Sequence, residues 1–233
     1  MAKTPKKIFL IDGSGYMFRA YYAMMRQRLS NSRGLPAGGV MVFARMLLGV
    51  LRDKAPAYAA VAFDRPEPTF RHEMYPEYKA NRDAPPEDII AQIPYMQRVV
   101  EVLRIPVLSR AGAEADDLIG SLADCAVAQG FDVVLVTADK DFSQLVSDRV
   151  RIWDPMKNVD IGPAEVEEKW GVPPARFVDI QALMGDSSDN IPGVPGIGEK
   201  TAVALINEFG SLDEVLASTD RIKRPKQRQS LEE

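Results

Sequence analysis

Nine carboxylates dominate the residues of this chain that could do chemistry. Each lies at the end of an expected strand or in a tight acidic cluster: Asp12, Asp64, Glu114, Asp116, Asp117, Asp139, Asp141, Asp186 and Asp189. The sequence has one histidine, His72, and one cysteine, Cys125. Carboxylates gathered without imidazole or thiol favour Mg²⁺ or Mn²⁺ over Zn²⁺. We therefore expect a centre with two or more such ions, which would hold the attacking and leaving oxygens of a phosphodiester.

The net charge and the composition bound the class of protein. A net charge of −4 is unusual for a protein that binds nucleic acid. Without the nine carboxylates, however, the rest of the chain carries about +5. The 233 residues, 46% of them hydrophobic, suffice for one α/β domain with a small appendage. The single cysteine excludes an internal disulfide. The first apolar run, residues 8–11, is too short for a signal peptide or a membrane span, so we expect a cytoplasmic protein with no membrane partner.

A parallel sheet would bring the carboxylates together. Short apolar runs predict strands at residues 7–11, 58–63, 105–108, 132–136 and 150–153. Helical spacing predicts helices at residues 15–26, 36–53, 87–103, 114–128 and from 142, with a break or kink at Pro94. This alternation predicts an α/β fold, with a mostly parallel central sheet and helices on both faces.

The chain is expected to divide near residue 162. After that point the pattern becomes wholly helical, so we expect a catalytic core at 1–162 and a small all-helical subdomain at 163–233. Residues 65–86 are polar, basic, aromatic and rich in proline, which predicts a mobile and partly helical excursion from the core. Cys125 falls among apolar residues of an expected helix and is predicted to be a core residue.

The position of the acidic residues favours function over local structure. In open α/β sheets the functional crevice lies at the carboxyl ends of the strands, where Asp12, Asp64 and Asp139 all fall. Taken alone, each would more often be a turn or N-cap residue. Glu114 and Asp117 share one helical face and could merely complement the helix dipole. Three strand ends and two acidic clusters would need independent explanations, so the joint pattern favours a metal site.

A glycine-rich stretch, residues 193–201, predicts a tight turn between two helices. Gly193, Gly196 and Gly198 would let the backbone approach a phosphate, and the N–H groups of Lys200 and Thr201 would donate to it. Such a turn binds a DNA backbone without reading its sequence. The alternative is a plain helix–loop–helix connector.

A basic and aromatic stretch in the excursion could clamp a single strand by charge and by stacking. Its members are Arg65, Phe70, Arg71, His72, Tyr75, Tyr78, Lys79 and Arg82. His72 has no neighbouring carboxylate pattern, so it is expected to be exposed or to contact phosphate rather than to be catalytic. The alternative for the whole stretch is a solvated surface loop.

Taken in order, these residues resemble the 5′ nuclease (5′-3′ exonuclease) domain of bacterial DNA polymerase I, within the flap endonuclease family. The resemblance runs from about residue 7 to about residue 228. The matching segments are residues 11–19, 63–64, 70–72, 78–82, 114–117, 137–141 and 185–202, with the sequences IDGSGYMFR, FD, FRH, YKANR, EADD, TADKD and GDSSDNIPGVPGIGEKTA.

The resemblance implies a role for each matched residue. One metal ion at the scissile phosphate would be held by Asp12, Asp64, Glu114 and Asp116. A second would be held by Asp139, Asp141, Asp186 and Asp189, with Asp117 close by. Lys79 and Arg82, at the base of an arch region at about 65–95, would grip the scissile phosphate and the threaded 5′ strand. Arg19 would contact phosphate near the cut, Arg71 and Tyr78 would contact DNA, and the glycine turn would bind duplex and could hold K⁺.

The resemblance also implies an activity and partners. It implies a Mg²⁺-dependent 5′-3′ exonuclease and flap endonuclease, which removes 5′ flaps and RNA primers in replication and repair. The partner would be DNA with a 5′ flap, a nick or an RNA primer, met by a monomer in the bacterial nucleoid. In the family, further helices follow the segment that ends here, and polymerase domains can be linked to it.

Two other functions are possible on the sequence. A non-catalytic DNA-junction binder could keep the fold, but it would have no use for nine mutually repelling carboxylates. A PIN-type metal-dependent ribonuclease shares the strand-end carboxylates, but it lacks the glycine turn and the arch region.

Overall fold

The computed structural model describes residues 5–27 and 29–233, which pack as two units. The first unit holds the described residues up to Phe70, together with Ala84–Phe142 and Ser147–Ile161. The second holds Arg71–Asp83, Ser143–Val146 and Gly162–Glu233. The helical unit therefore includes two short segments that come from earlier in the chain. No helix in the described ranges is both long and apolar enough to cross a membrane.

The first unit is built on a six-stranded sheet in the order β3-β2-β1-β4-β5-β6. The strands are β1 (Lys7–Asp12), β2 (Tyr58–Ala62), β3 (Val107–Leu108), β4 (Asp132–Val136), β5 (Val150–Asp154) and β6 (Val159–Ile161). All neighbouring strands are parallel except β5 and β6, which are antiparallel. In register, Ile11 of β1 pairs with Val61 of β2 on one side and with Val136 of β4 on the other.

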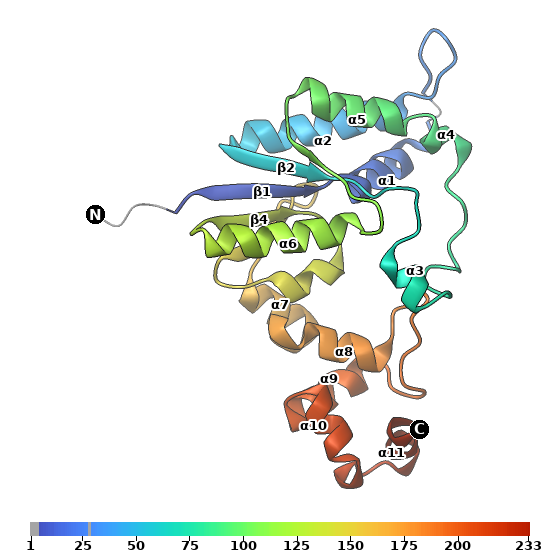
Figure 1. The fold of residues 1–233 in the computed structure, drawn as a ribbon, viewed down its shortest axis with the longest axis vertical. Coiled ribbons are helices and arrows are strands. Elements are labelled where there is room, and N and C mark those ends of the chain that lie inside the picture. Colours follow the sequence, from blue (N-terminus) through green and yellow to red (C-terminus); the bar gives the residue numbers. More distant parts are fainter. Residues whose placement is uncertain (1–4, 28) are drawn as a thin grey trace. The chain divides into compact units, whose positions relative to one another are not determined.

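Helices cover both faces of this sheet, as Figure 1 shows for α1, α2 and α5 on one side and α6 on the other. The helices of this unit are α1 (Gly13–Met24), α2 (Gly38–Lys54), α4 (Glu87–Ile90), α5 (Ile93–Val102) and α6 (Ala115–Ala128). Phe9 and Ile11 of β1 belong to a core cluster with Phe43 and Leu47 of α2. Because successive strand residues point to opposite faces, Leu10 lies on the face that α6 covers. This two-sided burial explains the continuous apolar runs of the strands.

The structure confirms the predicted fold class and corrects several details of the elements. The edge strand β6 was not predicted, because its three residues, Val-Asp-Ile, give too little signal. The predicted helix 87–103 divides at Ala91–Gln92, and Pro94 lies in the first turn of α5 rather than at the break. The helix expected from residue 142 is a 3₁₀ helix, η1 (Lys140–Leu145).

Cys125 was predicted to be a core residue, and this is wrong. The buried positions of α6 are Ala115, Ile119, Ala123 and Ala126, and Cys125 lies on the exposed side of the helix. Two small neighbours in sequence, Ala123 and Ala126, suggested a buried surrounding, but the helical repeat of 3.6 residues turns position 125 outward.

The second unit is helical. Its elements are α3 (Phe70–Met74, all but its first residue), α7 (Pro163–Trp170), η2 (Pro174–Arg176), α8 (Phe177–Met184), α9 (Glu199–Phe209), α10 (Leu212–Ala217), η3 (Thr219–Arg221) and α11 (Pro225–Glu232). Its own core centres on Phe177, Ile180 and Leu183 of α8 with Leu205 and Ile206 of α9. The segment between α8 and α9, residues 185–198, carries the acidic pair and the glycine turn.

Candidate active site

Three neighbouring strands deliver carboxylates to one edge of the sheet. β1, β2 and β4 are adjacent and parallel, so their carboxyl ends lie at the same edge. Asp12 is the last residue of β1, Asp64 follows β2 by two residues, and Asp139 follows β4 by three. The arrangement agrees with the sequence-based expectation that strand ends gather the acidic residues.

Asp12 is buried and fixed by two hydrogen bonds. Its Oδ1 accepts from the backbone N–H of Gly15 at 2.7 Å, and its Oδ2 accepts from the hydroxyl of Thr137 at 3.0 Å. A Cβ at position 15 would lie 2.2 Å from Asp12 Oδ2, so only glycine fits there. Asp12 is thus also the N-cap of α1, the plain role that its position allows.

Hydrogen bonds also order the loop that follows β4. The hydroxyl of Thr137 accepts from the N–H of Asp139 at 3.1 Å, and Asp139 Oδ1 accepts from the N–H of Asp141 at 2.9 Å. Lys140 Nζ lies 3.4 Å from Asp141 Oδ1. Thr137 therefore links Asp12 on β1 to the acidic pair after β4.

The start of α6 brings in three further carboxylates. Glu114 is the N-cap, and its side chain forms a capping box with Asp117, whose Oδ2 accepts from the Glu114 N–H at 2.9 Å. Asp64 Oδ1 accepts from the N–H of Ala115 at 2.7 Å, which ties the strand end to the helix start. Asp116 lies in the first turn of the helix.

The electrostatics of this group show that its charges repel one another. Burial, and to a lesser extent the charges of Asp12, Asp139, Asp64 and Glu114, together raise the pKa of Asp116 to about 8. Burial also raises the pKa of Asp12 to about 6, against two hydrogen bonds that lower it. Buried carboxylates that lie near one another and hold protons near neutral pH are stabilised in their charged form by a cation. The residues therefore fit a divalent metal ion.

No three histidine, cysteine, aspartate or glutamate side chains within the described ranges enclose a cation by themselves. Which of the nine predicted carboxylates ligate an ion directly stays a prediction.

A cavity of about 150 Å³ opens beside Asp12 and is lined by Gly15, Tyr16, Arg19, Thr137, Ala138 and Asp139. Arg19, predicted to contact phosphate, makes two hydrogen bonds to Asp154 at the end of β5, at 3.0 and 3.3 Å. The sequence analysis missed Asp154, which is a buried strand-end carboxylate like Asp12. The buried hydroxyl of Tyr16 has no hydrogen-bond partner, and burial, together with the charge of Asp154, raises the Tyr16 pKa.

The remaining predicted metal ligands, Asp186 and Asp189, lie in the second unit, between α8 and α9. The N–H and C=O of Asp186 pair with those of Ile191, and Asp186 Oδ1 accepts from the N–H of Ser188 at 2.8 Å. Asp189 accepts hydrogen bonds at both carboxylate oxygens, from the hydroxyl of Tyr78 at 3.0 Å and from Arg82 at 2.6 Å. The structure therefore places Asp189 beside two residues that were predicted to contact DNA.

Other predicted DNA contacts have mixed surroundings. Tyr78 is only 5% exposed and packs edge-on against His72, so its ring is not accessible to a base in this structure. His72 itself is half-buried, where the sequence suggested an exposed or phosphate-contacting residue. Lys79 and Arg71 are half-buried, whereas Arg82 is exposed.

The glycine turn connects α8 to α9, as predicted. Gly193 packs so closely on the end of α8 that a Cβ there would lie 2.3 Å from the carbonyl carbon of Met184. Gly196, Gly198 and Lys200 are exposed. The N–H of Thr201 was predicted to be available to a phosphate, but it donates to Gly198 O at 2.9 Å.

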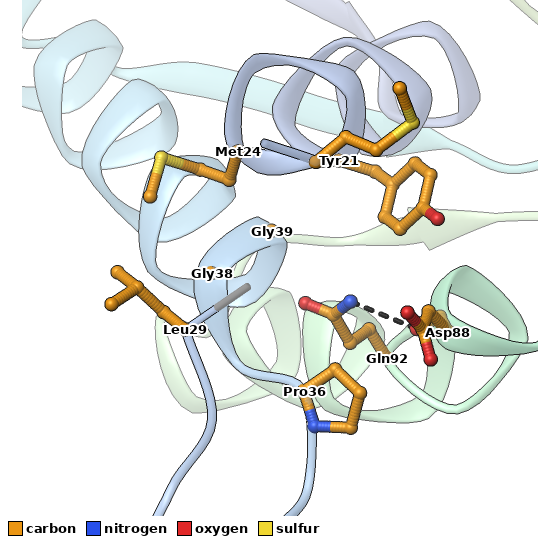
Figure 2. A pocket seen from close by; sticks show the side chains of 9 residues that line it. Tyr21, Met24, Leu29, Pro36, Gly38, Gly39, Asp88 and Gln92 are labelled. Atoms are coloured by element: carbon orange, nitrogen blue, oxygen red, sulfur yellow. Dashed lines mark hydrogen bonds between the residues drawn. The ribbon is translucent and has the colours of Figure 1, made fainter. Parts of the chain in front are cut away.

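A second cavity, of about 40 Å³, lies where α1 ends and α2 begins (Figure 2). None of the nine predicted carboxylates lines it. Gln92, which lines it beside Asp88, is buried, and its amide donates to Asp88 O at 2.9 Å and accepts from the N–H of Val40 at 3.2 Å. Gln92 thus satisfies an N–H in the first turn of α2, which has no side-chain cap of its own. We assign this cavity a structural role.

Two family models together match the chain from residue 7 onward. The 5′-3′ exonuclease N-terminal resolvase-like domain matches residues 7–171, and the 5′-3′ exonuclease C-terminal SAM fold matches residues 172–233. The chain belongs to the 5′-3′ exonuclease family, a class of nucleases. The resemblance found in the sequence is thereby confirmed.

Individual relatives narrow the comparison. DNA polymerase I of Rhizobium leguminosarum is 45% identical over 98% of this chain and 23% of its own length. The chain spans about a quarter of the length of the curated relatives it matches. A structure of T5 5′-exonuclease with bound divalent metal ions (zinc) is 23% identical, with a TM-score of 0.81 over 97% of this chain and 84% of that one. The catalytic core of Rad2 in complex with DNA substrate is 16% identical, with a TM-score of 0.62 over 97% and 71%. Both structures share the fold.

Proposed function

We propose that the chain is a structure-specific 5′ nuclease that cleaves phosphodiester bonds of DNA flaps and RNA primers and depends on Mg²⁺ or Mn²⁺. The observation that carries the proposal is the carboxylate cluster at the strand ends. Membership of the 5′-3′ exonuclease family gives the reaction class, and the raised pKa values of the buried Asp12 and Asp116 support a bound cation at the cluster.

The metal site is proposed at the edge of the sheet. Asp12, Asp64, Glu114 and Asp116 would hold one ion, and Asp139 and Asp141 would contribute to a second, with Asp117 nearby. When bound, the ions would stabilise the attacking and leaving oxygens of the phosphodiester. Asp186 and Asp189 stay predicted ligands of the second ion on the resemblance alone.

The chain's own residues would orient the substrate. The guanidinium of Arg19 lines the cavity beside Asp12, where it would bind a phosphate oxygen. Lys79 and Arg82 would bind phosphates of the 5′ strand, and the exposed backbone of the glycine turn would bind duplex without reading its sequence. The same turn could hold K⁺ through its carbonyl oxygens.

We infer from the same features that the partner is DNA with a 5′ flap, a nick or an RNA primer, met by one copy of the chain. The neighbouring Rad2 structure is a complex with DNA substrate, which supports a nucleic-acid partner for this fold. The curated relatives are polymerases of about four times this length, which supports a link to polymerase domains.

The test is cleavage of a 5′-labelled double-flap DNA with Mg²⁺. Discrete products cut near the flap junction are expected from the unmodified chain and should vanish with EDTA and in the Asp139→Asn variant. Tight flap binding without cleavage would instead indicate a junction binder. Preference for single-stranded RNA over the flap would indicate a PIN-type ribonuclease.

A further inference from the structure

Six hydrogen bonds join residues 77–82 to residues 187–190 within the helical unit, and we call these two segments the latch. Three of them accept at Asp189: Oδ1 accepts from Arg82 Nη2 at 2.6 Å, Oδ2 from the Tyr78 hydroxyl at 3.0 Å, and the backbone O from the Lys79 N–H at 2.9 Å. Two accept at the backbone before it, where Asn81 Nδ2 donates to Ser187 O at 2.7 Å and Arg82 Nε donates to Ser188 O at 3.1 Å. In the sixth, Asn190 Nδ2 donates to Glu77 O at 2.7 Å. The partners are more than 100 positions apart in sequence. The latch is therefore a tertiary structure and not a local turn.

The backbone on both sides of the latch has little freedom. Lys79 and Asn190 both have φ of +57°, in the left-handed region, which a residue such as Lys79 seldom adopts and Asn adopts more readily. The segment 187–190 is enclosed by the reciprocal pairing of Asp186 with Ile191. Gly185, just before Asp186 in the chain, packs so tightly that an added Cβ would lie 2.3 Å from Gly193 N. The hydrogen bond from Lys79 N to Asp189 O thus holds a strained turn against a closed loop.

The latch leaves N–H donors of Arg82 exposed to a ligand. A guanidinium has five N–H donors, and Arg82 uses two of them in the latch while its side chain stays 53% exposed. Fixing a long basic side chain before it binds removes much of the entropy lost on binding. The latch therefore holds the backbone of Lys79 and the side chain of Arg82 in place before a substrate binds.

We propose that Asn81 and Asn190 are positioning residues, which hold Lys79 and Arg82 in the arrangement that grips phosphates of the 5′ strand. This inference rests on the proposed nuclease function and gives a role to two residues that lie in matched segments but were assigned none there. Neither amide is needed to carry charge to the substrate. Each binds a backbone carbonyl of the opposite segment.

Hydrogen exchange tests whether the latch holds in solution, independently of activity. The amide of Lys79 is expected to be protected in the unmodified chain, and its exchange should become about fivefold faster in Asn81→Ala, the effect of losing one hydrogen bond of about 1 kcal/mol. Asn190→Gly is the second variant, because glycine accepts a positive φ without strain. Asn207→Ala is the matched control, since Asn207 also donates to one backbone carbonyl in this unit, that of Gly171, but lies outside the latch.

Flap cleavage then tests the positioning role. In Asn81→Ala and in Asn190→Gly, kcat/KM is expected to fall about fivefold through KM, while Asn207→Ala is unchanged. Combined with Lys79→Ala and Arg82→Ala, the Asn81→Ala change should have no further effect, because a positioning residue acts only through the groups that it positions.

The outcomes distinguish whether the latch forms in solution from whether its asparagines position Lys79 and Arg82. Faster exchange with unchanged cleavage, or a full additional loss in the combined variant, would overturn the positioning role. Unchanged exchange in both asparagine variants would show that the latch does not hold the segment and would also overturn it. If the unmodified chain cleaves no substrate at all, the proposed function fails and the positioning role fails with it, while the exchange rates still report whether the latch exists.

Discussion

Two regions of this molecule are rich in aspartate, and they differ in how the charges are matched. At the strand ends and the start of α6, burial and the neighbouring carboxylates raise the pKa values of Asp12 and Asp116. In the latch, Asp189 faces Arg82 and the hydroxyl of Tyr78, and both of its oxygens are hydrogen-bonded. We propose that a cation balances the charges of the first region, whereas partners within the chain balance Asp189 in the second. On this proposal, the same residue type supports metal binding in one place and tertiary structure in the other.

The largest effect is expected from removing a charge of the carboxylate cluster. Asp116→Asn should lower Mg²⁺-dependent flap cleavage by about 10³-fold or more, because metal ions contribute several kcal/mol of transition-state stabilisation. Single-turnover cleavage measures it. Asp220→Asn, which changes an exposed aspartate of η3, serves as the control and should cleave normally. Cleavage by Asp116→Asn within tenfold of the unmodified rate would contradict a metal role for the cluster.

Removing a positive charge of the second region should have a smaller effect of a different kind. Lys79→Ala is expected to reduce kcat/KM by about 10²-fold, since a charge-assisted contact is worth roughly 2–3 kcal/mol. Metal affinity should not change. A reduced Mn²⁺ affinity in this variant would show that the two regions do not differ as described.

The cluster should also make the metal-free protein sensitive to pH. Because the folded-state pKa values of Asp116 and Asp12 are raised, the folded state binds more protons, so stability is lost as the pH rises from about 4 through about 8. We expect a melting temperature several degrees lower at about pH 9 than at about pH 5, since 1 kcal/mol shifts it by roughly 2–4 °C in a chain of this size. Calorimetry in EDTA measures it. Mg²⁺ should restore the loss, and Asp116→Asn should reduce it. A melting temperature that rises over this pH range would contradict the raised pKa values of Asp116 and Asp12.

The smallest effect is expected from neutralising Asp154, a carboxylate of the first unit that is already paired with Arg19. Asp154→Asn keeps the shape of the pair with Arg19 but removes its charge, so it should cost about 1–2 kcal/mol of unfolding free energy, less than a fully buried pair because Arg19 is partly exposed. Urea unfolding measures it. The exposed pair of Arg52 and Asp53 provides the control, and Asp53→Asn should cause no measurable change. Equal losses of unfolding free energy in both variants would show that burial of Asp154 does not determine the loss.

The sequence predicted the sheet and the gathering of strand-end carboxylates because both follow from short-range rules. Apolar runs and helical spacing are local, and parallel strands necessarily end together, so Asp12, Asp64 and Asp139 could be grouped without coordinates. Asp154 obeys the same rule but was not considered, because the predicted strand ended at residue 153, one residue before it. Its partner, Arg19, is 135 positions away.

The latch could not be predicted in the same way. Its contacts join residues 77–82 to 187–190 across more than 100 positions, and no periodicity encodes such a pairing. The motif containing Tyr78 and Asn81 indicated DNA contact, while burial of Tyr78 and the hydrogen bond of Asn81 came only from the structure. Where two distant polar segments meet, sequence reasoning supplies the residues but not their partners.

Titration of Mn²⁺ into the Asp116→Asn and Lys79→Ala variants, beside the unmodified chain, tests the central claim most directly. A cation-dependent cluster and a self-sufficient latch predict that Lys79→Ala binds Mn²⁺ like the unmodified chain and that Asp116→Asn binds it at least about tenfold more weakly. Equal binding by all three would contradict the claim that the strand-end carboxylates form the metal site.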